Sequence, residues 1–463
     1  ASEYGEFTGV EEILNEVCAR EGVILEEMQR QAVLKACAHR GGVLVLNGQA
    51  GCGKTFTLNI IIKVLKELYR RNGLYFTAEI MAPTGQVAHR ATGLPANTVH
   101  RALHMVVDKD TSSEVFISSE CVIIDEFSMM GIKLAAVLFS AITTGSKTII
   151  MGDFEQLQSI DPGNVLKDII DSGMVPVVTL TVVKRQGSGS GVLHNANEIL
   201  AGNPIRSQKV NENGVKNNAY IIRSSDPVAA RKSIVSMAIS MRKKGYKLQD
   251  IQVLCPQKQT DVGVNALNYA LQNAFNPPRE EAAEVFSRLV DIHDDDGTPR
   301  KVQLMLRTGD KVINTANNYD MKFYTFQKGV GFVEDFSRVG VVNGEMGRIA
   351  KILKVKDGKT VHQRVYVQIG SGQYIMYEDN WDDLSMAYAM TIHRSQGSQW
   401  PIVIAPVMYC NRSMLSRKIL YTLYTRAQDA NVIYGTSESI QYAIDNTYSA
   451  NRNTWLKERL RAA

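Results

Sequence analysis

Four apolar runs in the first 180 residues each end at a polar or glycine-rich turn. The runs cover residues 43–46, 80–82, 121–124 and 149–151, and the turns are Asn47–Gly48, Pro83–Thr84, Asp125–Glu126 and Gly152–Asp153. Continuous rather than alternating apolar residues are typical of strands that are covered on both faces. Residues 54–71, followed by Gly73 as a cap, repeat apolar side chains at helical spacing. The pattern predicts one α/β domain with a parallel sheet.

A similar but interrupted pattern occupies the second half of the chain. Apolar runs at 251–255, 402–405 and 432–434 predict strands of a second parallel sheet. Between about 300 and 380 the pattern changes to short β-rich segments at 364–369 and 373–377, with glycine-containing turns between them. We therefore expect a small β-barrel-like insertion within a second α/β domain.

The length and composition are those of an ordinary soluble protein. The chain has 463 residues, of which 44% are hydrophobic and 21% are charged, which excludes global disorder and a fibrous repeat. Its apolar stretches fall far short of the ~20 residues that a membrane span needs. The first 12 residues are acidic and lack the apolar segment of a secretory signal. We expect a cytoplasmic protein of two to four domains.

Cysteine spacing and net charge add little to the functional assignment. Cysteines occur at positions 18, 37, 52, 121, 255 and 410, without a Cys-x-x-Cys pair, which favours reduced structural thiols over a disulfide framework or a zinc cluster. The formal net charge of +5 permits a nucleic-acid partner but does not require one.

The first turn carries a phosphate-binding motif. The pattern G-x-x-x-x-G-K-[ST] follows an expected strand and precedes an expected helix, which argues against a chance match. Its glycines let backbone N–H groups surround an anion, Lys54 reaches the β- and γ-phosphates, and the Thr55 hydroxyl holds Mg²⁺. The residues expected to bind the nucleotide here are Gly48, Gln49, Ala50, Gly51, Cys52, Gly53, Lys54, Thr55 and Phe56.

Two carboxylates close the third apolar run. Asp125 is placed to hold the Mg²⁺ shell, and Glu126 is placed to polarise the attacking water. An Asp-Glu pair alone is often only a solvated strand end. Some 70 residues after a phosphate loop, however, it indicates Mg²⁺ binding and activation of water. The sequence therefore predicts a Mg²⁺-dependent site that binds and hydrolyses a nucleoside triphosphate, with ATP as the expected nucleotide.

Six stretches follow one another in a characteristic order: residues 25–33, 48–55, 125–129, 152–159, 180–186 and 420–427. This ordered set resembles the motifs of superfamily 1 (1B) helicases, in the RecD-like branch that includes the Dda-type phage helicases, over about residues 25–435. The resemblance implies that Gln29 contacts adenine and that Gln156 senses the γ-phosphate. It also implies that Arg185 and Arg426 are arginine fingers, although each could instead be an ordinary surface arginine.

The same resemblance implies contacts with single-stranded DNA. Short hydroxyl, amide and backbone groups bind phosphates without reading sequence, which suits a protein that slides along any strand. The residues implied are Pro83, Thr84, Gly85, His100 and Arg101 in the first domain, and Thr391, His393, Ser395 and Gln396 in the second. His100 and His393 could alternatively be structural histidines.

The fold implied is α/β, with two RecA-like parallel-sheet domains. The first spans residues 25–180 after a short segment, 1–24, and has a pin-like insertion at about 104–119 that a plain surface loop would also explain. The second spans 181–300 and 381–445, with an SH3-like β insertion at 301–380, and residues 446–463 form a tail. Arg394 and Tyr424 depart from the usual residues of their motifs but keep the chemistry plausible.

The leading hypothesis is an ATP-dependent DNA helicase that moves along single-stranded DNA and separates duplex strands. The resemblance implies 5′→3′ movement, a duplex with a single-stranded tail as substrate, and a monomer. One alternative is an ATP-gated factor that binds or remodels single-stranded DNA without separating strands. Another is a ring-forming P-loop ATPase that acts on protein. Strand displacement on a 5′-tailed duplex separates the first two possibilities.

Overall fold

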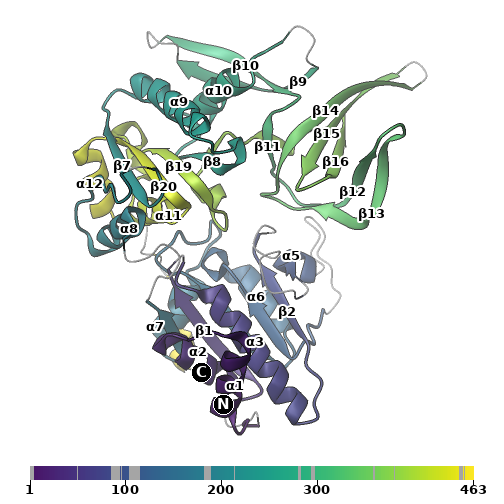
Figure 1. Cartoon of the computed structure of the whole chain (residues 1–463), viewed down its shortest axis with the longest axis vertical. Coiled ribbons are helices and arrows are strands. Elements are labelled where there is room, and N and C mark those ends of the chain that lie inside the picture. Colours follow the sequence, from purple (N-terminus) through teal and green to yellow (C-terminus); the bar gives the residue numbers. More distant parts are fainter. Residues whose placement is uncertain are drawn as a thin grey trace. The chain divides into compact units, whose positions relative to one another are not determined.

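The structure is a computed structural model, in which the chain forms two compact units (Figure 1). Unit 1 comprises Ala1–Gly189 and Thr447–Ala463, and unit 2 comprises Ser190–Asn446. The residues described are 5–49, 51–84, 94, 96–103, 115–181, 189–212, 214–279, 283–293, 298–357, 360–379, 381–447, 452 and 454–462.

Unit 1 is built on a parallel sheet that has six strands within the described residues, in the order β3-β2-β4-β5-β1-β6. The strands are β1 (Gly42–Gly48), β2 (Ala78–Ala82), β3 (Ala96–Thr98), β4 (Cys121–Ile124), β5 (Lys147–Gly152) and β6 (Val177–Leu180). The helices are α1 (Val10–Glu21), α2 (Glu27–Cys37), α3 (Lys54–Arg71), α5 (Val99–Ala102), α6 (Ile132–Ala141), α7 (Val165–Ser172) and α13 (Leu456–Ala462), with a 3₁₀ turn, η1 (Phe127–Met129). All four predicted apolar runs are strands of this sheet.

The sheet of unit 1 is covered on both faces, which explains its continuous apolar runs. Leu44 and Leu46 of β1 pack into a core with residues of α1, α2 and α3, whereas Val45 between them packs into a second core with residues of α6 and α7. The predicted helix over residues 54–71 is confirmed as α3. It is followed by Gly73, which takes φ +68° and donates its N–H to the carbonyl of Arg70 at 3.1 Å.

Unit 2 contains a second parallel sheet, with five strands in the described part of the chain, in the order β18-β8-β19-β20-β7. Its strands are β7 (Asn218–Arg223), β8 (Ile251–Cys255), β18 (Ala389–Thr391), β19 (Trp400–Pro406) and β20 (Ala427–Gly435). The helices are α8 (Gly191–Ala201), α9 (Pro227–Lys243), α10 (Val264–Phe275), α11 (Arg417–Tyr424) and α12 (Ser437–Asp445), with 3₁₀ turns η2 (Leu248–Asp250), η3 (His393–Ser395) and η4 (Tyr409–Met414). The three apolar runs predicted here are β8, β19 and β20.

The predicted β-rich stretch is an antiparallel sheet inserted into unit 2. It has seven strands among the described residues, in the order β13-β12-β16-β15-β14-β11-β17. These are β11 (Lys311–Asn314), β12 (Asn318–Gln327), β13 (Gly331–Val341), β14 (Met346–Asp357), β15 (Thr360–Ile369), β16 (Gln373–Glu378) and β17 (Leu384–Met386). A separate antiparallel hairpin, β9 (Glu284–His293) and β10 (Pro299–Arg307), precedes the insert.

All six cysteines are free thiols, as predicted, and most are buried. Burial raises the pKa of the Cys121 thiol to about 12, so this group stays protonated at neutral pH. No helix in the described part of the chain combines the length and apolarity needed to cross a membrane.

Candidate active site

The strand order of unit 1 brings several predicted site residues to one edge of its sheet. β5 lies between β1 and β4, and all three strands run parallel. The phosphate loop follows the carboxyl end of β1, the Asp125–Glu126 pair follows that of β4, and Asp153 follows that of β5. In open parallel sheets this edge is where ligands bind.

The phosphate loop turns from β1 into α3 through left-handed glycines. Gly51 has φ +87° and Gly53 has φ +84°, a region that favours residues without a Cβ atom. Gly53 is also the N-cap of α3 and supplies no side-chain cap to the N–H groups of the first turn. Lys54 Nζ donates to the carbonyl oxygens of Gly48 and Gln49. Ala50, which was also predicted to bind nucleotide, lies outside the described residues.

Gln29 is packed against this loop. It is the third residue of α2, it is 2% exposed, and its Oε1 accepts the N–H of Glu26 at 3.2 Å. A Cβ atom at Gly53 would lie only 2.8 Å from Nε2 of Gln29. The glycine therefore allows a close approach between the predicted adenine contact and the phosphate loop, although Gln29 precedes Gly53 by 24 residues in the sequence.

Asp125 and Glu126 lie in the tight turn that ends β4. Asp125 Oδ1 accepts the backbone N–H of Glu126 at 2.8 Å, and Glu126 takes φ +50°. A non-glycine residue in the left-handed region costs free energy, and such residues cluster at functional sites. Both carboxylates are partly exposed, as is the Thr55 hydroxyl in the first turn of α3. Hard oxygen donors of this kind suit Mg²⁺.

Gln156 follows β5 and is buried beside Asp153. Its Nε2 donates to Asp153 Oδ2 at 3.1 Å, and its backbone N–H donates to the Asp153 carbonyl at 3.1 Å. The charge of Asp153 also raises the pKa of the Cys52 thiol, after burial as the main cause, so this carboxylate lies near the phosphate loop. Asp153 belongs to the predicted motif at 152–159, but the motif assigned a role to Gln156 and none to Asp153.

Arg426 lies directly before β20 in unit 2 and is 2% exposed. Its guanidinium donates to the carbonyl oxygens of Thr422 at 3.3 Å and Ser398 at 3.1 Å, and to Thr425 Oγ1 at 3.2 Å. The ordinary surface role considered as an alternative does not fit this burial. The other predicted arginine finger, Arg185, lies outside the described residues.

The residues of unit 1 that are predicted to contact single-stranded DNA lie at the end of β2 and on α5. The side chain of Thr98 accepts the N–H of Arg101 at 3.2 Å and so begins the short helix that carries His100. Burial lowers the pKa of the His100 imidazole, and the Asp161 carboxylate partly offsets this shift. Pro83 and Thr84 are partly exposed, and Gly85 lies outside the described residues.

The residues of unit 2 that are predicted to contact DNA lie at the end of β18 and in the turn after it. Thr391 Oγ1 accepts the N–H of Arg394 at 3.2 Å, and burial lowers the pKa of His393. Ser395 is completely buried, and its hydroxyl donates to the Ile392 carbonyl at 2.7 Å. Gln396 is also buried. The Ser395 side chain thus shapes the turn, which leaves Thr391 and His393 as the more accessible groups.

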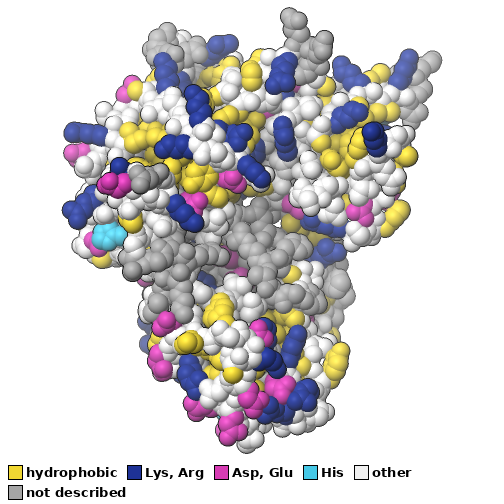
Figure 2. Space-filling model, in the orientation of Figure 1, with side chains coloured by type: hydrophobic (Ala, Val, Ile, Leu, Met, Phe, Trp, Pro, Cys, Tyr) yellow, Lys and Arg dark blue, Asp and Glu magenta, His cyan; other side chains and the backbone are white. Residues whose placement is uncertain are grey.

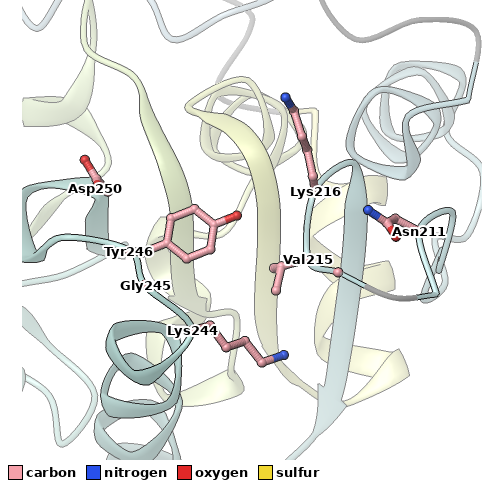
Figure 3. A pocket seen from close by; sticks show the side chains of 8 residues that line it. Asn211, Val215, Lys216, Lys244, Gly245, Tyr246 and Asp250 are labelled. Atoms are coloured by element: carbon pink, nitrogen blue, oxygen red, sulfur yellow. The ribbon is translucent and has the colours of Figure 1, made fainter.

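None of the predicted site residues is among the residues that line a pocket of about 610 Å³ in unit 2 (Figure 3). Its lining includes Lys216 before β7, Lys244 and Tyr246 after α9, and Asp250 of η2. Tyr246 donates its hydroxyl proton to Asp429 Oδ2 at 3.4 Å.

Comparison with protein families gives two matches. The AAA domain family matches residues 24–217, and the UvrD-like helicase C-terminal domain family matches residues 386–434. The first match includes the phosphate loop, the Asp125–Glu126 pair and Gln156, and the second includes Thr391, His393 and Arg426.

Relatives with assigned names match almost the whole chain. It is 28% identical over 449 residues to the ATP-dependent RecD2 DNA helicase of Deinococcus radiodurans, covering 96% of this chain but 53% of that protein. It is 27% identical over 474 residues to the RecBCD enzyme subunit RecD of Mycolicibacterium smegmatis, covering 94% of this chain and 75% of that protein. The chain thus spans about half the length of the first relative.

Among solved structures, the chain matches a Pif1 helicase from Bacteroides in complex with ADP-AlF3 and single-stranded DNA. The TM-score is 0.50 at 18% sequence identity, and the match covers 95% of this chain and 97% of the other. At this identity the likeness shows a shared fold.

Proposed function

The chain belongs to the superfamily 1B helicases, the ATP-dependent DNA helicase family that contains the RecD-like and Pif1-like proteins, and on this premise we propose that it moves along single-stranded DNA and separates duplex strands. We propose 5′→3′ movement from the motif resemblance. The expected substrate is a duplex with a single-stranded tail, and the expected active species is a monomer.

The nucleotide site is proposed to bind ATP through the phosphate loop. The uncapped first turn of α3 offers backbone N–H groups and a partial positive charge to phosphate oxygens. Lys54 Nζ, which donates to loop carbonyls, is on the same loop and can turn to the β- and γ-phosphates. The buried Gln29 amide, in close contact with Gly53, supports a role in positioning the base.

Mg²⁺ is proposed to be held by Thr55 and Asp125, which supply a hydroxyl and a carboxylate oxygen. When bound, the ion would neutralise charge on the β- and γ-phosphates. Glu126 would orient and polarise the attacking water, and Gln156 would respond to the γ-phosphate. We expect Arg185 and Arg426 to stabilise the charge that develops as the phosphoryl group leaves.

Single-stranded DNA is proposed to contact the turns after β2 and β18 and the residues of α5. Arg101, Thr391 and His393 are partly exposed or exposed, and they offer guanidinium, hydroxyl and imidazole groups to phosphates, whereas the hydroxyl of Thr84 is buried. Lys and Arg side chains are spread over the face of unit 2 that Figure 2 shows, which favours a polyanion. We propose that the antiparallel insert is the SH3-like element. The proposed pin falls mostly on residues 104–114, which lie outside the described residues.

The observation that carries the proposal is the meeting of the phosphate loop, the Asp125–Glu126 pair and the Gln156 motif at the carboxyl edge of one parallel sheet. The test compares ATP-dependent strand separation on 5′-tailed and 3′-tailed duplexes, with ATP hydrolysis measured with and without single-stranded DNA. Separation of the 5′-tailed duplex alone is the expected result. DNA-stimulated hydrolysis without strand separation would instead support the ATP-gated binding factor, and hydrolysis that DNA does not change would contradict both.

A further inference from the structure

The end of the chain returns to unit 1 and binds to α7. Helix α13 packs against α7, and Leu456 and Leu460 join the core formed by α6 and α7. The guanidinium of Arg461 donates to the carbonyls of Asp171 and Ser172, at 2.8 and 3.1 Å. These carbonyls belong to the last turn of α7, where no further helical N–H reaches them. The tail is therefore anchored at its far end by packing and by helix capping.

Arg452 makes a different contact, closer to the nucleotide site. It binds the segment Ser159–Gly163, here called the 159–163 loop. Its Nη2 donates to the Ser159 carbonyl at 2.6 Å, and its Nη1 donates to the carbonyls of Asp161 at 2.7 Å and Gly163 at 2.8 Å. A planar guanidinium can bridge several carbonyls at fixed angles, whereas an ammonium group is a single point donor. One side chain thus fixes alternate carbonyls of the loop.

The remaining contacts of the 159–163 loop leave it little room to move. The Pro162 carbonyl, between two of those bound by Arg452, accepts the N–H of Ile132 at the start of α6, at 2.9 Å. A Cβ atom at Gly131 would lie 2.5 Å from Cβ of Asp161, so the loop is pressed against the beginning of that helix. Ser159 is buried and donates its hydroxyl proton to the Asp161 carbonyl at 2.7 Å.

The loop also lies between two groups of different proposed function. It begins three residues after Gln156, which is proposed to respond to the γ-phosphate. At its centre, the Asp161 carboxylate acts electrostatically on His100, which is proposed to contact DNA. A segment in this position can transmit a conformational change from bound single-stranded DNA to the nucleotide site only if its own conformation is well defined.

We propose that Arg452 is a positioning residue that holds the 159–163 loop in the conformation through which bound single-stranded DNA accelerates ATP hydrolysis. The C-terminal segment that carries Arg452 would then set how strongly DNA binding is coupled to ATP hydrolysis, without contacting the DNA or the nucleotide. This inference rests on the proposed function, because it requires an ATPase that single-stranded DNA stimulates.

The test measures kcat for ATP hydrolysis in the full chain with and without saturating single-stranded DNA, and the ratio of the two is the stimulation. Arg452→Ala should lower this ratio by about fivefold or more, which is within the usual range of coupling between sites. The Kd for a labelled strand, measured by fluorescence anisotropy, should change by less than about twofold, because Arg452 does not contact the strand. Arg452→Lys should give an intermediate ratio, since one ammonium group cannot replace a guanidinium that donates to three carbonyls from two nitrogens.

Arg461→Ala and Arg459→Ala are the matched controls. Arg461→Ala removes the other guanidinium contact of the tail but leaves the 159–163 loop untouched, and Arg459 is exposed on α13. Both should keep the wild-type ratio. Equal loss in Arg461→Ala and Arg452→Ala would overturn the proposal, as would an Arg452→Ala ratio equal to wild type. A wild-type ATPase that no single-stranded DNA stimulates would overturn the proposed function itself, and the coupling with it.

Discussion

The guanidinium of Arg426 donates to the carbonyl oxygen of Ser398 at 3.1 Å, which ties the start of β20 to the turn that follows β18. That turn carries Thr391 and His393, the accessible members of the proposed strand contact in unit 2. The arginine that is proposed to act on the γ-phosphate therefore also supports the turn that is proposed to bind DNA, within one unit. A change in the hydrogen bonds of this guanidinium can be transmitted to the turn through the backbone carbonyls of Ser395 and Ser398, both of which accept from Nη1.

Arg426→Ala should lower kcat for ATP hydrolysis far more than it weakens nucleotide binding. An arginine finger acts chiefly on the transition state, and its loss typically costs about 10³-fold or more in kcat. Because the side chain is buried and hydrogen-bonded through all three of its guanidinium nitrogens, the variant should also melt at a lower temperature. Steady-state kinetics, nucleotide titration and calorimetry measure these effects. Arg412→Ala, an exposed arginine in η4, is the control. Equal losses of kcat and nucleotide affinity would contradict the finger role.

Lys54→Ala should abolish both ATP hydrolysis and strand separation, because the ammonium is the only charged side chain of the phosphate loop. Lys66→Ala, on the exposed side of the same helix, should behave as wild type. Hydrolysis assays and displacement of a labelled strand provide the measurements. A Lys54→Ala protein that still unwinds would remove the phosphate loop from the mechanism.

Glu126→Gln should keep nucleotide binding but reduce hydrolysis. The amide preserves the size of the side chain and the left-handed turn, but it cannot accept a proton from water. Loss of a general base typically lowers kcat by about 10²- to 10⁴-fold. Equilibrium binding of ATP and single-turnover hydrolysis separate the two effects. If hydrolysis stays within a few-fold of wild type while Asp125→Asn abolishes it, another group activates the water.

The sequence predicted the parts of the fold that repeat a pattern. Continuous apolar runs identified β1, β4 and β5 because both faces of the sheet are covered, and the helical stripe identified α3 to its last residue. The hairpin of β9 and β10 was not predicted. Its burial alternates irregularly, and its register shifts between Leu304 and Met305, so neither strand repeats a simple pattern.

The candidate site was predicted as a set of motifs, but not as a set of contacts. The phosphate-loop pattern identifies Lys54 without structural information, whereas the close packing of Gln29 on Gly53 depends on how α2 lies against the loop. Arg452 carried no local signal, because its three carbonyl partners are nearly 290 residues away in the sequence. Tertiary contacts of a single side chain leave no periodic trace.

The last prediction concerns Lys311, the first residue of β11, whose buried ammonium connects the antiparallel insert to β8 of unit 2. Its Nζ donates to Gln252 Oε1 at 2.8 Å and to the Ile251 carbonyl at 3.0 Å, and burial lowers its pKa to about 7, with Asp250 opposing the shift. In the unfolded chain a lysine has its ordinary pKa of about 10.4, so between about pH 7 and 10 the unfolded state binds more protons than the folded state. The free energy of unfolding should therefore rise with pH in this window.

The comparison with Lys311→Met isolates that effect, because methionine keeps most of the side-chain volume but cannot titrate. Urea unfolding of both proteins at several pH values between 7 and 10 should show the wild type gaining stability relative to the variant. The gain is at most about 1.4 kcal/mol per pH unit, the value for one proton. Below pH 7 both folded and unfolded lysines are charged, and the difference between the proteins should become constant. Parallel pH profiles across the whole range would mean that Lys311 keeps its proton when buried, held by its carbonyl and amide acceptors.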